Sequence, residues 1–113
     1  MDNRTVNILG FEWLIKEQSE DENELLKDCD GYCDWTVREL CIRREMDGTL
    51  KNMDKYVNKV TRHEIVHAFL CECGLAECSG EVESWAQNET MVDWIARLGP
   101  AIFKAWKEAG VED

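Results

Sequence analysis

Two histidines and a glutamate near the middle of the chain have the spacing of a zinc-binding helix. The segment reads His63-Glu64-Ile65-Val66-His67, and these are the only two histidines in the sequence. On a helix, residues four apart share a face, so both imidazoles can reach one ion while Glu64 lies beside it. A catalytic zinc keeps one position for water, which makes Glu64 a candidate general base. The motif therefore favours a zinc-dependent hydrolase, and among hydrolases it favours a peptidase.

A catalytic zinc usually has three protein ligands, so a second segment must supply one more. Glu89, in the predicted helix that follows, is the candidate carboxylate ligand. Asp93, one turn further on, is a candidate acceptor for the other N–H of a ligating imidazole, a bond that would fix the tautomer. The competing interpretation is that both belong to the 24 acidic residues of a solvated surface.

The two segments H-E-I-V-H and N-E-T-M-V-D together resemble the gluzincin pattern, in which H-E-x-x-H is followed by a distant helix bearing N-E-x-x-x-D, as in thermolysin-like enzymes. The run from Glu89 to Ala96 is also similar to the E-x-x-A-N-x-F-A segment of ImmA/IrrE-like metallopeptidases, with Asp93 where that pattern has Asn. Those are small proteins, often encoded by phages and mobile elements. The resemblance covers roughly positions 50 to 98.

This resemblance implies a set of roles. His63, His67 and Glu89 would be the Zn²⁺ ligands, Glu64 the general base, and Asp93 the acceptor for a ligating imidazole. The substrate would be a peptide or protein. The group that stabilises the developing oxyanion stays open among Tyr32, Tyr56 and Arg97.

Length and composition limit the alternatives. A chain of 113 residues is expected to form a single domain, residues 1–113. The N-terminus lacks the pattern of a signal peptide, and no apolar run approaches the roughly 20 residues that span a bilayer, so we expect a cytoplasmic protein without a membrane partner. A net charge of −11 repels phosphate backbones and argues against nucleic acid as a partner.

Six cysteines are many for this length, and without secretion they are expected to be reduced, mostly buried thiols. A second metal site from Cys71, Cys73 and Cys78, with Cys29 or Cys33, is the alternative. Their spacing does not match the C-x-x-C knuckles of structural zinc sites, which weighs against it.

The N-terminal half is expected to supply two strands. Residues 5–16 are rich in β-branched and aromatic side chains, with Gly10 as a bulge. Residues 19–30 are acidic and predict an exposed connection with a short helix at Leu25 and Leu26; the spacing does not match a calcium-binding loop. Residues 34–44 predict the second strand, although the alternation slips around Glu39 and Leu40, and Asp47-Gly48 predicts a turn.

In zincin-like folds a strand often lies at the sheet edge just before the active helix. If this resemblance holds, the strand at 34–44 would pair with an extended substrate, and Arg43 and Arg44 would flank the site. The other interpretation of these arginines is solvated surface charge.

The C-terminal half is expected to be helical. One helix should span residues 52–73 and end at Gly74. A second should begin between 81 and 84 and run to Leu98, and Gly99-Pro100 should separate it from a third that ends near Gly110. The predicted fold class is therefore α+β, a minimal zincin-like domain in which a small N-terminal sheet packs on the H-E-x-x-H helix, followed by two further helices.

Two other functions compete with the hydrolase. In one, the chain is an acidic, phage-type binding or inhibitor protein for a basic partner, and its zinc site is structural or vestigial. In the other there is no metal, and His63 and His67 are buried core histidines.

Overall fold

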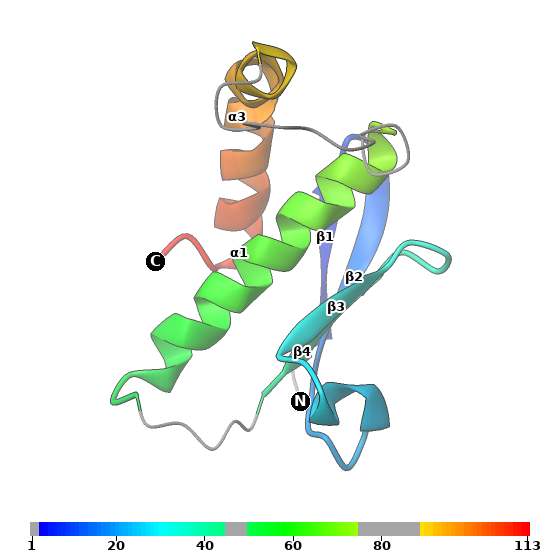
Figure 1. Cartoon of the computed structure of the whole chain (residues 1–113), viewed down its shortest axis with the longest axis vertical. Helices are drawn as coiled ribbons and strands as arrows, with labels where there is room; N and C mark the ends of the chain where they lie inside the picture. The colour runs from blue at the N-terminus through cyan, green and yellow to red at the C-terminus, as the bar shows by residue number, and fades with distance from the viewer. Residues whose placement is uncertain (1–2, 45–49, 75–88) are drawn as a thin grey trace.

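The computed structural model describes residues 3–44, 50–74 and 89–113. These form an α+β structure in which a four-stranded mixed sheet carries two long helices (Figure 1). The elements in chain order are β1 (Asn3–Ile8), β2 (Phe11–Gln18), the 3₁₀ helix η1 (Glu24–Lys27), β3 (Gly31–Asp34), β4 (Glu39–Arg43), α1 (Met53–Glu72) and α3 (Glu89–Ala109). The α+β class predicted from the sequence is confirmed.

The first predicted strand is a hairpin instead. β1 and β2 pair antiparallel around Leu9 and Gly10, both of which have positive φ (52° and 92°). Two such residues form the tight turn that suits the twist of a hairpin, so Gly10 is a turn residue and not a bulge. Because the chain reverses at this turn, the buried apolar residues of the segment fall at even positions before it and at odd positions after it, which a single strand could not explain. The buried residues are even-numbered in β1 (Val6, Ile8) and odd-numbered in β2 (Trp13, Ile15).

The second predicted strand is also only half of a hairpin. β4 covers Glu39–Arg43, and its antiparallel partner β3 comes before the predicted start. Between them, the backbone N–H and the hydroxyl of Thr36 both donate to the Asp34 carboxylate, and Arg38 has a φ of 54°. These interactions form the turn. The slip in alternation at Glu39 and Leu40 is therefore the point at which the chain enters β4. The predicted turn at 47–48 lies outside the described residues.

The two hairpins join side by side in the order β1-β2-β4-β3, with β2 and β4 parallel. β4 thus has a neighbour on each side, which contradicts the prediction that residues 34–44 form an open edge for a substrate. The edge strand nearest α1 is β3. The Arg43 guanidinium pairs with Glu20 at 2.9 Å, and whether Arg43 flanks a substrate stays a prediction. The short helix expected at Leu25 and Leu26 is present as η1.

α1 begins and ends close to the predicted positions. The side chain of Asn52 accepts a hydrogen bond from the backbone N–H of Lys55, which satisfies a free donor of the first turn. At the other end Gly74 has a φ of 85°, the left-handed conformation typical of the residue that follows a helix. The interval contains no Pro or Gly that would interrupt the helix.

α3 runs without a break through Gly99 and Pro100, so the prediction of two helices separated at this point is wrong. An interior proline costs a helix about 3 kcal/mol. Here the segment is held by tertiary packing, because Ile102, Ala105 and Ala109 are buried on the sheet side. The predicted start of this helix, between 81 and 84, lies outside the described residues.

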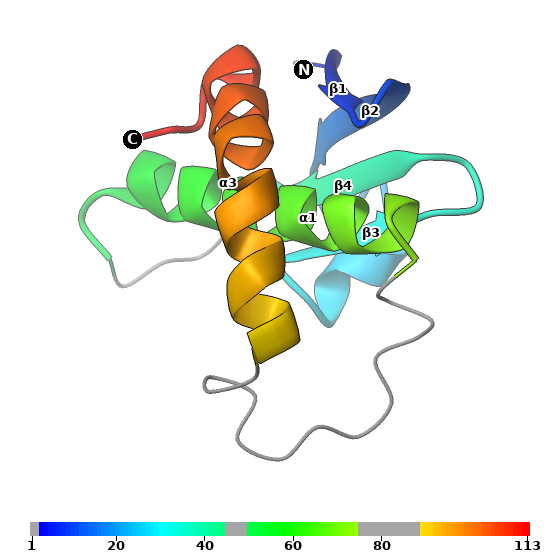
Figure 2. The same cartoon turned by 90° about the horizontal axis from the view of Figure 1, so that it is seen from above.

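Both helices contribute to one core with the sheet (Figures 1 and 2). α1 packs on β3 and β4, and α3 packs on β1 and contacts α1. The fully buried side chains of the sheet in this core are Val6, Ile8, Trp13, Ile15, Leu40 and Ile42. None of the described helices has the length and hydropathy needed to cross a membrane.

Candidate active site

The two histidines of α1 converge. The Nε2 atoms of His63 and His67 lie 3.1 Å apart, with ring centroids 4.8 Å apart and planes inclined by 69°. Two nitrogens bound to one tetrahedral zinc at about 2.05 Å would be separated by about 3.3 Å. Both side chains are exposed, so they are not the core histidines of the metal-free alternative. This pair therefore fits two positions of a zinc site with little rearrangement.

The imidazole of His67 is held towards its neutral form. Desolvation by the surrounding protein, and then the neighbouring His63 ring, lower the pKa of His67. A metal binds the neutral imidazole, so this shift favours a ligand.

Glu64 follows His63 on α1 and is buried towards the sheet. Its side chain is only 6% exposed, and burial raises the pKa of the Glu64 carboxyl to about 7. The close approach of β3 produces this burial, because a Cβ added to Gly31 would lie 3.4 Å from Cγ of Glu64 and 3.1 Å from Cγ1 of Val60. A carboxyl with a pKa near neutrality is suited to take and return a proton.

His63 and Glu64 share a pocket of about 180 Å³ between the first half of α1 and the start of β3. Its lining residues are Asp30, Gly31, Tyr56, Lys59, Val60, His63 and Glu64. A predicted metal ligand and the predicted base thus face one solvent-accessible cavity. Neither Asp30 nor Gly31 was predicted as a site residue from the sequence, where Gly31 signals only a break between elements.

Tyr56 and Asp30 close one side of this pocket. The Tyr56 hydroxyl donates a hydrogen bond of 2.5 Å to the Asp30 carboxylate, and this bond raises the pKa of the phenol. The ammonium of Lys59 lies 5.6 Å from the centre of the Tyr56 ring. Of the three residues considered for oxyanion stabilisation, Tyr56 alone lines this pocket.

The other two candidates have different partners. The Tyr32 hydroxyl accepts a hydrogen bond of 2.8 Å from the Asn23 amide. The Arg97 guanidinium donates at 2.8 Å to Asp93, and both of these side chains are largely exposed on α3.

The predicted contributions of the second helix remain predictions. Glu89 is the first residue of α3, and its side chain lies outside the described part of the chain. Asp93 accepts from Arg97, and no bond between Asp93 and either histidine is found among the described residues. Across the described ranges, no group of three or more His, Cys, Asp or Glu side chains is placed to hold a metal.

The cysteines proposed as a second metal site do not gather in the described structure. The Cys29 thiol donates to the carbonyl of Leu25, and the Cys73 sulfur accepts from the Trp94 indole at 3.2 Å. Cys78 lies outside the described residues. Among the cysteines that the structure describes, Cys33 on β3 and Cys71 on α1 are close enough to interact.

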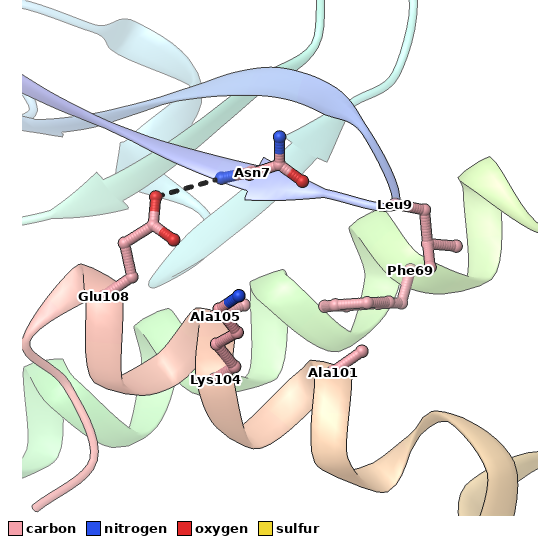
Figure 3. Close-up of a pocket in the computed structure, with 7 residues that line it drawn as sticks. All are labelled: Asn7, Leu9, Phe69, Ala101, Lys104, Ala105 and Glu108. Carbon is pink, nitrogen blue, oxygen red and sulfur yellow. Dashed lines mark hydrogen bonds between the residues drawn. The ribbon is translucent and has the colours of Figure 1, made fainter.

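A second pocket, of about 210 Å³, lies between the β1–β2 turn and α3 (Figure 3). It is lined by Asn7, Leu9, Phe69, Ala101, Lys104, Ala105 and Glu108. Glu108 accepts a hydrogen bond of 3.4 Å from the Asn7 backbone across its mouth. It contains neither histidine nor Glu64, so the smaller pocket is the candidate site.

Comparisons with known proteins returned no matching family model, no matching curated protein and no matching solved structure.

Proposed function

We propose that this chain is a zinc-dependent metallopeptidase of the gluzincin type. The observation that carries the proposal is the separation of 3.1 Å between the Nε2 atoms of His63 and His67, beside a pocket that also holds Glu64. The raised pKa of Glu64 and the lowered pKa of His67 support it, because they favour a proton-accepting carboxyl next to the neutral imidazole of His67.

In this proposal His63, His67 and Glu89 hold the metal. A bound zinc would acidify a water molecule and polarise the scissile carbonyl. Glu64 takes the proton of the attacking water and later passes it to the leaving amine. Asp30 holds the Tyr56 phenol in the pocket, and the single phenolic proton would turn from Asp30 to the developing oxyanion when substrate binds. The edge strand β3 lies beside the pocket and offers unpaired backbone groups to an extended peptide.

The first test is metal content. The full chain, purified without chelator or added metal and then titrated with zinc, should hold about one zinc per molecule. The double variant His63→Ala/His67→Ala should hold none, while Lys55→Ala, an exposed change on the same helix, should match the wild type. A folded wild-type protein that takes up no zinc would exclude the proposal and favour the acidic binding protein.

The second test separates binding from turnover. Glu64→Gln should retain zinc and lose cleavage of a peptide library, with products identified by mass spectrometry. Cleavage by Glu64→Gln at the wild-type rate would remove Glu64 from the mechanism.

The third ligand is tested separately. Glu89→Ala should weaken zinc affinity strongly, and Asp93→Ala should weaken it less, because a partner of a ligand contributes about 10- to 100-fold. Unchanged affinity in Glu89→Ala would require another donor.

A further inference from the structure

Cys33 is placed on the face of β3 that covers α1. In the antiparallel register Gly31 is opposite Ile42 and Cys33 is opposite Leu40, and both partners belong to the buried core between sheet and helices. Residues two apart in a strand share a face, so Cys33 points the same way as Gly31. A side chain at Gly31 would meet Val60 and Glu64 of α1. Cys33 therefore faces the next turns of the same helix.

Cys71 lies on those turns. It follows Glu64 by two helical turns and falls on the same stripe of α1. The Cys33 thiol is close enough to interact with the Cys71 thiol and with the carboxyl of Glu64. Both cysteines are half-buried. Each thiol thus has the other as its neighbour, and solvent can reach the pair.

We propose that Cys33 and Cys71 form a dithiol site that a peroxide-class oxidant converts into a disulfide, linking the edge strand β3 to α1. The proposal does not depend on zinc or on peptidase activity. It uses two residues from elements that are far apart in sequence, so the cross-link fixes a tertiary contact.

The chemistry balances with hydrogen peroxide as the oxidant. The Cys71 thiolate attacks one peroxide oxygen, the O–O bond breaks, and the products are a sulfenic acid on Cys71 and one water once the leaving hydroxide is protonated. The Cys33 sulfur then attacks the Cys71 sulfur, the S–OH bond breaks, and the proton of Cys33 leaves with the hydroxide as a second water. The two thiols lose two electrons in total, and the peroxide gains them.

The order of the two steps follows from the surroundings of Cys33. Burial, and then the Cys71 thiol, raise the pKa of Cys33 to about 12. Because the thiolate is the nucleophile, a thiol held in its protonated form is a poor first attacker, so we assign the attack on peroxide to Cys71 and the second, resolving step to Cys33.

The other described cysteines have different neighbours. Cys41 is 3% exposed and lies opposite Tyr32 in the register, on the alternate face of β4 from Leu40 and Ile42. Cys29 bonds to a carbonyl near η1, and Cys73 bonds to the indole of Trp94. We expect these thiols not to compete for Cys33 or Cys71 in the folded protein.

The test is peptide mapping of the full chain after brief treatment with hydrogen peroxide, quenched by acid and alkylated. Trypsin places Cys33 in the peptide 28–38 together with Cys29, and Cys71 in the peptide 63–97 together with Cys73 and Cys78. The expected product is a link between these two peptides, with the mass of two hydrogens lost. The peptide that holds Cys41 should stay unlinked.

Matched variants resolve the ambiguity within each peptide. Cys33→Ser and Cys71→Ser should lose the link, whereas Cys29→Ser and Cys73→Ser should keep it. A link that survives Cys33→Ser, or peroxide treatment that leaves 28–38 and 63–97 unlinked while other cysteines oxidise, would overturn the proposal. If a variant fails to fold, fragmentation of the linked wild-type peptides by tandem mass spectrometry assigns the two linked cysteines directly, and a link through cysteines other than Cys33 and Cys71 would overturn the proposal.

Discussion

The Tyr56 hydroxyl donates a 2.5 Å hydrogen bond to Asp30, a residue 26 positions earlier in the chain. This bond ties the beginning of α1 to the segment that enters β3. It also sets one wall of the pocket that holds His63 and Glu64. The contact therefore links the stability of the fold to the shape of the candidate site.

Removing the phenol should affect turnover more than metal binding. Under the proposed function, Tyr56→Phe should retain zinc and lower kcat for a cleaved peptide by about 10²- to 10³-fold, the usual loss of one oxyanion donor. Tyr32→Phe is the matched control, because its hydroxyl bonds to Asn23 instead. An unchanged kcat in Tyr56→Phe would exclude this residue from the reaction.

The close approach of β3 to α1 requires a residue without a side chain at position 31. Gly31→Ala should lower the free energy of unfolding by about 1–3 kcal/mol, because the new methyl would meet the Cys41 carbonyl and Cγ1 of Val60, each at 3.1 Å. Gly99→Ala is the control: its added methyl meets nothing within 4 Å, and alanine should stabilise α3 by up to about 1 kcal/mol. Urea denaturation measures both, and equal effects of the two changes would contradict the packing argument.

Burial of Glu64 should make the metal-free protein less stable as pH rises. The pKa of this carboxyl is near 4.5 when unfolded and about 7 when folded, so the folded state binds the proton more tightly. The stabilisation is fully present below pH 4.5 and is lost as pH rises through 7. The difference between the two pKa values corresponds to about 3 kcal/mol of stability.

Glu64→Gln tests this linkage. The variant should be more stable than wild type at pH 8 without zinc, and the two should converge near pH 4. A wild-type protein whose stability relative to Glu64→Gln does not change with pH would show that Glu64 titrates normally.

The far end of α1 is anchored by Glu72, which accepts hydrogen bonds from the buried indole of Trp13 at 2.8 Å and from Arg38 at 2.9 Å. Glu72→Ala leaves that indole N–H unpaired and should cost about 1–3 kcal/mol. Glu12→Ala, a change at an exposed carboxylate of β2, should lie within about 0.5 kcal/mol of wild type. Thermal and urea unfolding measure the free energy of unfolding of both variants. A Glu72→Ala variant as stable as the wild type would show that Glu72 does not stabilise this end of α1.

Local signals in the sequence were sufficient to predict where α1 begins and ends. An Asn at the start, a Gly just past the end and an uninterrupted run between them act within a few residues, so they can be recognised without tertiary information. α3 shows the opposite case. Gly99 and Pro100 are strong local signals for a break, yet burial of Ile102 and Ala105 against the rest of the fold outweighs them.

The two hairpins were missed because their turns have weak signals. Leu9 and Arg38 adopt positive φ, a conformation that their side chains do not favour and that the sequence does not announce. The available signal was the change of phase along each segment, from Ile8 to Trp13 and from Cys33 to Leu40.

The candidate site likewise contains one feature that the sequence predicts and one that only the fold provides. The spacing of His63 and His67 on one helix fixes their convergence, so the sequence alone predicts it. Asp30, which meets Tyr56, comes from a different element, and only the fold brings the two together.

The sheet order also constrains how the chain reaches this state. β1–β2 and β3–β4 are local hairpins, but the β2–β4 ladder joins residues far apart, such as Ile15 and Leu40. Local pairs close at low entropic cost, and distant pairs form later. We expect both hairpins to gain hydrogen-exchange protection before the β2–β4 ladder; simultaneous protection would contradict this order. The candidate pocket is lined by α1 and by the start of β3, so it lies on one side of that seam, and docking of α1 on the second hairpin completes it before the first hairpin joins the sheet.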